Sequence, residues 1–257
     1  MNHQTITYIK KEHIGVIGFK DEMEKQGVIY RLKDEISEVS ETVSSETDIW
    51  LVVLMGMGTL STILESDSNL EGLERRDEGG IMPPSMVESI AKIEKPVIAG
   101  IEGIVLDQSL ELMLACDIRI ATDKSRFGLA QLKKHRIPWN GGTQRLPRLV
   151  GKGWALEMLL TGETVDAKEA HRIGLVNKVV SKEDLEKTVM EMAQEMASKS
   201  PIALRYAKEA INAGMDLTLD QGLHLEADLY MLLHTSRDRS EGIRAFQEKR
   251  KPEFEGK

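Results

Sequence analysis

The chain has 257 residues, of which 41% are hydrophobic and 30% are charged, a balance typical of folded globular proteins and not of disordered ones. Its net charge of -8 is spread along the sequence without a basic stripe, which argues against a nucleic-acid-binding protein. There is no apolar leader segment, no apolar run long enough to span a membrane, and only one cysteine, Cys116, so an internal disulfide is excluded. We therefore expect a cytoplasmic protein in a reducing compartment, with no membrane and no nucleic-acid partner.

The first half of the chain predicts strands that alternate with helices. Two short strands are expected at 5–10 and 15–20, and apolar residues recur at helical spacing over 27–43. The continuous apolar run WLVVLM at 50–55 is typical of a buried parallel strand. Residues 56–80 are rich in Gly, Ser, Asp and Glu and predict a long surface loop with a little helix.

From residue 86 the alternation continues and then gives way to helices. Helices are expected at 86–94 and 109–116, with strands at 96–99, 104–105, 118–121 and 127–129. After residue 146 the spacing is helical over roughly 152–160, 166–172, 182–198, 201–214 and 217–233. The sequence therefore predicts an α/β core over residues 1–195 and a helical C-terminal region over 196–257.

Glu111 is the first candidate for chemistry. It lies among Leu110, Leu112, Met113 and Leu114, where a buried carboxylate is costly and its pKa should rise. The alternative is a partly exposed acid near a helix start, stabilised by the helix dipole. The six histidines show no metal-ligand spacing, and no glycine-rich nucleotide-binding loop is present. We therefore expect neither a metal nor a bound nucleotide cofactor.

The segment KPVIAGIEGIVLDQSLELMLACDIRIATDKSRFGLAQLKKHRIPWNGGTQRL at 95–146 resembles the crotonase (enoyl-CoA hydratase/isomerase) superfamily. The segments TGETVDAKEAHRIGLVNKVV at 161–180 and EGIRAFQEKRKPEFEGK at 241–257 are also similar to that family. The resemblance implies an α/β spiral of repeated ββα units, followed by a helical region that trimerises. It also implies a homotrimer or a dimer of trimers acting on an acyl-CoA substrate, with no cofactor other than the coenzyme A that the substrate carries.

By resemblance, Glu111 is one of two catalytic carboxylates that activate water and exchange a proton with the α-carbon. The second carboxylate would fall at Gln131, whose side chain can hold water but cannot transfer a proton. Gln131 is therefore either a water-holding residue or a polar loop residue without a role. The substitution counts against a mechanism with two carboxylates.

The resemblance also implies two backbone N–H groups that polarise the thioester carbonyl. One is the amide of Gln108, in a turn that reads LDQSL where relatives commonly have three glycines. The other would come from the loop after the third strand, at Ser66 or Glu65 depending on a gap of one residue. Asp107 would disfavour a developing negative charge unless its side chain points away.

The remaining assignments concern the substrate. Trp139 occupies a position that faces the acyl pocket in relatives, so we expect it to favour a short or flat acyl group, with Asn140 beside it as a hydrogen-bond donor. The alternative for Trp139 is packing in the core near a subunit contact. Four residues are candidates for binding the coenzyme, although solvated surface positions are the alternative for each: Lys20, Lys25, Phe246 and Lys249.

The function that follows is hydration or dehydration of an enoyl-CoA through a thioester enolate held by backbone amides. Two alternatives stay open. The simultaneous changes at 107–109, at 65–66 and at Gln131 are also consistent with a CoA-binding or structural homologue that has lost catalysis. A single acid would also serve a thioester hydrolase or a decarboxylase.

Overall fold

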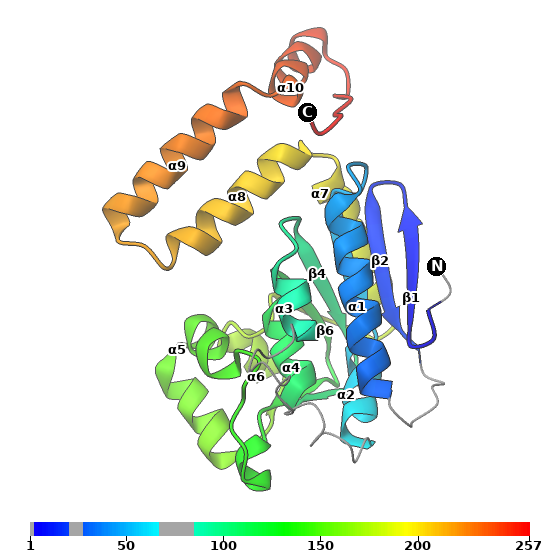
Figure 1. The fold of residues 1–257 in the computed structure, drawn as a ribbon, viewed down its shortest axis with the longest axis vertical. Coiled ribbons are helices and arrows are strands. Elements are labelled where there is room, and N and C mark those ends of the chain that lie inside the picture. Colours follow the sequence, from blue (N-terminus) through cyan, green and yellow to red (C-terminus); the bar gives the residue numbers. More distant parts are fainter. Residues whose placement is uncertain (1–2, 21–27, 67–84) are drawn as a thin grey trace, which may run out of the picture.

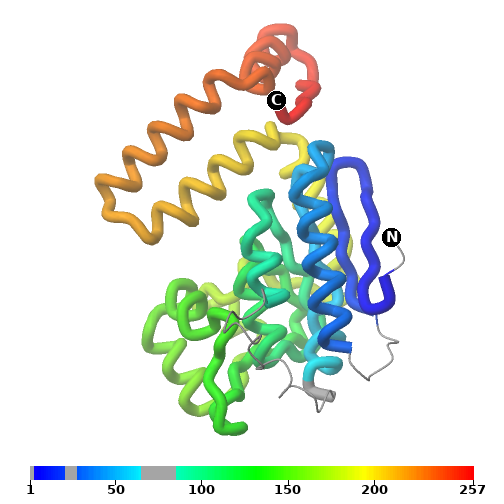
Figure 2. Tube along the Cα trace, in the orientation of Figure 1, coloured from blue at the N-terminus to red at the C-terminus, as the bar shows by residue number. Residues whose placement is uncertain are grey.

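The computed structural model describes residues 3–20, 28–66 and 85–257. Figures 1 and 2 show a sheet-containing core and a helical hairpin that stands away from it. The core contains the following elements: β1 (Ile6–Lys11), β2 (Ile14–Phe19), α1 (Val28–Ser45), β3 (Leu51–Met55), α2 (Met57–Ser66), α3 (Met86–Ala91), β4 (Val97–Ile101), β5 (Ile104–Leu106), α4 (Asp107–Leu114), β6 (Ile118–Thr122), β7 (Arg126–Gly128), the 3₁₀ helix η2 (Gln131–Lys134), α5 (Gly142–Thr161), β8 (Val165–Asp166), α6 (Ala167–Arg172), β9 (Lys178–Val180) and α7 (Leu185–Ala197).

The main sheet has six strands in the order β1-β2-β3-β4-β6-β9. Only the β1–β2 pair is antiparallel, and the remaining pairs are parallel. The carboxyl ends of β2, β3, β4 and β6 therefore lie along one edge of the sheet. In α/β proteins this edge is where functional loops gather.

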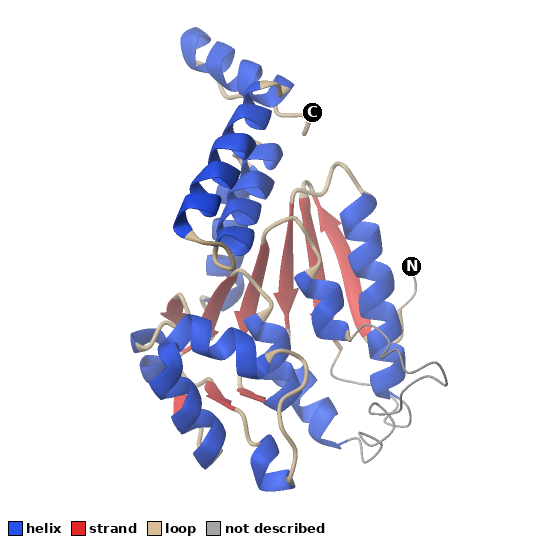
Figure 3. Cartoon of the chain, turned by 60° about the vertical axis from the view of Figure 1, so that its left-hand side comes forward, coloured by secondary structure: helices blue, strands red, loops and turns tan. Residues whose placement is uncertain are grey.

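Helices cover both faces of this sheet, which explains the continuous apolar strands (Figure 3). Along β3, Val52 and Leu54 belong to the larger core, which includes the buried side chains of α1 and α3. Leu51 and Val53 point to the opposite face and pack in a smaller core with Val189 and other side chains of α7. The two-residue period of a strand thus supplies two separate cores from one apolar run.

A second, smaller sheet has the order β5-β7-β8. It connects the main sheet to the segment that carries the candidate chemistry, because β5 leads directly into α4 and β7 leads into η2. The loop after η2 leads into α5, which is bent at Gly151, where φ is +79°. Helix α4 is thereby bordered by two loops that come from later in the chain.

The C-terminal region consists of α8 (Pro201–Gly214), α9 (Leu219–His234) and α10 (Arg237–Glu248). Helices α8 and α9 form an antiparallel hairpin, visible on the left of Figure 1. Lys208 of α8 attaches this hairpin to the core: its Nζ pairs with Asp117 at 2.7 Å and donates to the carbonyl oxygens of Ile93 and Lys95. Large apolar side chains of the hairpin remain exposed in the single chain: Ile211, Met215, Leu219, Leu223, Tyr230, Met231 and Leu232.

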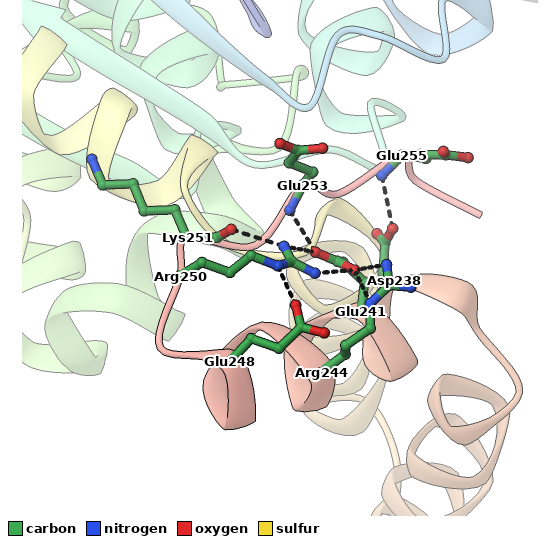
Figure 4. Close-up of polar contacts among 8 residues, drawn as sticks. All are labelled: Asp238, Glu241, Arg244, Glu248, Arg250, Lys251, Glu253 and Glu255. Carbon is green, nitrogen blue, oxygen red and sulfur yellow. Dashed lines mark hydrogen bonds and ion pairs between the residues drawn. The ribbon is translucent and has the colours of Figure 1, made fainter.

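Two acidic residues on one face of α10 hold the C-terminal segment (Figure 4). Glu241 accepts hydrogen bonds from Arg244, Arg250 and the amide of Glu253. Asp238 accepts from the amides of Glu255 and Gly256. The hydrogen bonds from Arg250, Glu253 and Arg244 keep the pKa of Glu241 well below its usual range. The segment is thus fixed against α10 by charge-assisted hydrogen bonds.

Most of the elements expected from the sequence are present. In the stretch at 56–80, expected to be a long loop with a little helix, residues 57–66 form helix α2, because Met57, Leu60 and Leu64 are buried at helical spacing. One strand was not expected: residues 178–180, between the helices expected at 166–172 and 182–198, form β9, which pairs with β6 at the edge of the main sheet. Within the described ranges, no helix is long and apolar enough to cross a bilayer, and no group of three or more His, Cys, Asp or Glu side chains could hold a metal.

Candidate active site

Glu111 is the centre of the candidate site. It lies in α4, whose other buried side chains are apolar except for Ser109, and it has no exposed surface. Its Oε1 accepts hydrogen bonds from the amides of Asn140 at 2.8 Å and Gly142 at 2.9 Å. Burial raises the pKa of Glu111, while these two amides act in the opposite direction because they stabilise the charged form. The partly exposed acid considered as an alternative is therefore excluded.

Gln131 lies against the same carboxylate from the other side. Its Nε2 donates to Glu111 Oε2 at 3.3 Å, and the residue is only 7% exposed. Gln131 is therefore a buried residue in contact with Glu111 and not an exposed loop residue, while its role stays a prediction. Position 131 therefore places a side-chain amide, and not a second acid, against Glu111.

The first residue of α4, Asp107, shows how the chain accommodates an aspartate where relatives commonly have glycine. Asp107 has a φ of +50°, a left-handed conformation that is unfavourable for most residues but tolerated by aspartate. Its Oδ1 accepts from the amide of Ala130 at 2.6 Å, and its Oδ2 pairs with Lys134 at 3.1 Å. The Asp107 carboxylate therefore binds Ala130, just before η2, and Lys134, at the end of η2. It thereby fixes the position of Ala130, the residue that precedes Gln131.

Gln108 follows Asp107 as the second residue of α4. Amides of the first helical turn have no carbonyl acceptor within the helix, and the positive end of the helix dipole lies there. The position is suited to an oxygen that gains negative charge. The backbone geometry thus favours Gln108 as an oxyanion donor, and its role stays a prediction.

The second predicted donor has a different environment. Glu65 and Ser66 lie at the end of α2 rather than in a loop. Helical amides donate to the carbonyl four residues earlier and are not free for a ligand. The loop expected to carry the second oxyanion donor is therefore helical as far as Ser66. This geometry does not support Ser66 or Glu65 as that donor.

The Gly141–Gly142 turn holds the carboxylate from the α5 side. Gly141 has a φ of +100°, a conformation that strongly favours glycine. A Cβ added at Gly142 would lie 3.1 Å from Glu111 Oε1 and 2.9 Å from Pro138 Cβ. Glycine is thus required where the backbone closely approaches Glu111.

Asn140 and Trp139 precede this turn. Asn140 is buried and donates its backbone amide to Glu111, and its role as a donor in the acyl pocket stays a prediction. Its Oδ1 has no hydrogen-bond partner among the described residues. Trp139 is 37% exposed, so it does not pack in the core of this chain, and its role toward an acyl group stays a prediction.

Three of the four predicted coenzyme-binding residues, Lys20, Phe246 and Lys249, lie in the described part of the chain. Lys20 follows β2, and its Nζ donates to the carbonyl of His3 at 2.6 Å. Phe246, which is 86% exposed, and Lys249 lie at the end of α10, at the far end of the molecule from α4 in Figure 1. Lys25 lies outside the described residues.

The sequence did not predict three groups that hold Glu111 or the residues around it: the amide of Gly142, the side chain of Asp107, and the donor nitrogen of Gln131. The glycine pair in GGTQRL was a visible signal for a close backbone approach. The engagement of Asp107 with Ala130 had no such signal, because the two residues lie 23 positions apart and meet only through the β5–β7 pairing.

Comparisons with known proteins agree with this geometry. The family model for enoyl-CoA hydratase/isomerase matches residues 10–257. A crotonyl-CoA hydratase of Syntrophomonas wolfei is 39% identical over 229 residues, which cover 86% of this chain and 88% of that protein. A short-chain-enoyl-CoA hydratase of Clostridium acetobutylicum is 36% identical over 223 residues, covering 85% of each chain. The crystal structure of an enoyl-CoA hydratase from Bacillus anthracis superposes with a TM-score of 0.84 at 34% identity, over 99% of this chain and 100% of that one. With a buried carboxylate in the middle of α4 and a family match over almost its whole length, the chain belongs to the enoyl-CoA hydratase/isomerase family.

Proposed function

We propose that the protein hydrates an enoyl-CoA, and catalyses the reverse dehydration, with Glu111 as its only catalytic carboxylate. The observation that carries this proposal is the fully buried Glu111, held by two backbone amides beside the N-terminal turn of α4. Relatives named as hydratases of crotonyl-CoA and short-chain enoyl-CoA support a short acyl group.

The reaction balances with one acid. Water adds its oxygen to the β-carbon of the enoyl thioester, and its proton passes to Glu111. The electron pair of the double bond moves onto the thioester oxygen, where the Gln108 amide and the α4 dipole stabilise the enolate. Glu111 then delivers a proton to the α-carbon and returns to its charged form. Its raised pKa makes the Glu111 carboxylate a stronger base for the first step and leaves more of the protonated form to supply the proton of the second.

The direct test is incubation of the full chain with crotonyl-CoA and a panel of enoyl- and aromatic acyl-CoAs, followed by mass spectrometry and by calorimetry of binding. A product heavier by one water supports hydration. The variant E111Q should reduce the rate by about 10²- to 10⁴-fold, whereas the exposed control E195Q on α7 should not. Release of free CoA would identify a thioester hydrolase instead, and binding without any turnover would identify a non-catalytic homologue.

We also propose that the chain assembles as a homotrimer or a dimer of trimers. The exposed apolar side chains of α8 and α9 support this, because such a surface is unusual for a monomer. Helix α10, at whose end Phe246 and Lys249 lie, is far from α4 in one chain (Figure 1), so any coenzyme contact from these two residues would reach the site of a neighbouring copy. Light scattering should show a trimer or hexamer, and the double change of Leu223 and Met231 to Lys should dissociate it. A wild-type monomer would contradict the assembly.

The proposed chemistry needs only a carboxylate and backbone amides, which supports an enzyme that uses no metal or prosthetic group. Metal analysis of the purified protein and turnover in the presence of a chelator test this point. The buried, unpaired Cys116 supports a reducing compartment such as the cytoplasm. Fractionation of the native cells tests that assignment.

A further inference from the structure

The two oxygens of Glu111 are held in different ways. Oε1 faces the N–H groups of Asn140 and Gly142. A backbone N–H group can only donate a hydrogen bond. A proton on Oε1 would therefore point toward the hydrogens of two N–H groups and repel them. Among the described residues, Oε2 accepts from one donor, the Nε2 of Gln131. The proton of the neutral carboxyl group is therefore excluded from Oε1 and belongs on Oε2.

The side chain of Gln131, which contacts Oε2, can act either as a hydrogen-bond donor or as an acceptor. A side-chain amide offers a donor nitrogen and an acceptor oxygen on the same carbon, and half a turn about its last bond exchanges the two. In the structure Nε2 is directed at Glu111, while Oε1 is buried without a hydrogen-bond partner among the described residues. A buried, unpartnered oxygen is costly and calls for an explanation.

We propose that Gln131 is a positioning residue whose amide turns with the protonation state of Glu111: Nε2 donates to Oε2 of the carboxylate, and Oε1 accepts from the Oε2–H of the carboxylic acid. The catalytic part of this inference rests on the proposed function, since a single acid that first takes and then returns a proton needs support in both states. The turning of the amide itself does not depend on any substrate.

The surroundings of Gln131 allow its side chain to turn while the backbone stays in place. The amide of Ala130, the preceding residue, is held by Asp107 Oδ1 at 2.6 Å. The carbonyl of Gln131 accepts from the amide of Arg136 at 3.0 Å, within the turn that ends η2. The terminal amide contacts Glu111 through one hydrogen bond of 3.3 Å, which is long for such a bond and easily exchanged.

The test is infrared difference spectroscopy of the full-length protein during a pH titration without substrate. The carboxylic C=O band of protonated Glu111 is assigned by its loss in E111Q. A hydrogen bond from the acid to Gln131 lowers the frequency of that band, so Q131M, which removes donor and acceptor at similar length, should move it to higher wavenumber. The control Q194M changes an exposed glutamine of α7 and should leave the band in place.

An unmoved band in folded Q131M overturns the proposal, because the acid then has no bond to this amide. Protein labelled with ¹³C-glutamine gives the same answer without altering Gln131: a side-chain amide band should shift as Glu111 titrates, and that shift should vanish in E111Q. Absence of the shift also overturns the proposal.

Kinetics provide a second readout if the protein hydrates enoyl-CoA. Q131M should lower kcat about tenfold or more, as expected for loss of a hydrogen bond to a charged group, with little change in KM. A complete lack of hydratase activity in the wild type would refute the proposed function and leave the spectroscopic result to decide the turning of the amide. An unchanged kcat in Q131M would overturn its catalytic role.

Discussion

Gly142→Ala tests whether Glu111 depends on the close backbone approach of α5. The added Cβ would lie 2.9 Å from Pro138 Cβ, 3.1 Å from Glu111 Oε1 and 3.2 Å from Glu111 Cγ. Carbon atoms in contact prefer about 3.5–4.0 Å, so both neighbours must move by several tenths of an ångström. The carboxylate would then leave the amide that now binds it at 2.9 Å.

Overpacking of this kind costs about 1–3 kcal/mol of stability. Activity should fall more steeply, by roughly 10- to 100-fold, because catalytic groups tolerate little displacement. The assays are thermal unfolding and the kcat/KM for crotonyl-CoA, measured for Gly142→Ala and for the control Gly153→Ala in the same helix.

Gly153 is a suitable control because its added Cβ would meet no atom within 4 Å. In a helix interior, replacement of glycine by alanine stabilises by about 0.5–1 kcal/mol, and activity should be unchanged. Gly142→Ala with wild-type kcat/KM would refute the reasoning, since the enzyme would then not need Glu111 where the turn holds it.

Three further outcomes are expected. Because burial raises the pKa of Glu111 in the folded state, wild-type stability should decrease as pH rises from the ordinary carboxyl range through the raised value, and E111Q should lack this decrease in denaturant titrations at several pH values. D107A should lower both stability and activity, because alanine at φ +50° loses the bond to Ala130, whereas D107N should retain most of both; equal effects of the two changes would contradict this. The pKa of Glu241 is lowered chiefly by Arg250, so the stability that Glu241 contributes to the fold is present above the ordinary carboxyl pKa and is lost in acid. E241Q should therefore speed proteolysis of the C-terminal segment at neutral pH. An unaltered digestion pattern would count against this role of Glu241.

The sequence was sufficient for the elements whose signals are local. The apolar run of β3 and the helical spacing of α1 predicted a buried strand and an amphipathic helix, because each element must bury its own face. Glu111 was recognisable as a candidate because an acid among leucines is unusual. Its neighbours in GGTQRL carried the resemblance to the family.

The tertiary structure decided what surrounds that acid. Three segments far apart in the chain meet at Glu111: α4 itself, η2 with Gln131, and the turn with Gly142. Their meeting depends on the pairing of β5 with β7 and on the path of the chain into α5, and such non-local contacts leave no local pattern. β9 was missed for the same reason, since three residues form a strand there only because β6 offers an open edge. The sequence alone therefore identified Glu111 as the candidate acid, because its neighbours along the helix are apolar. Which hydrogen-bond donors reach each of its two carboxylate oxygens was decided by the tertiary structure, because those donors come from other segments of the folded chain.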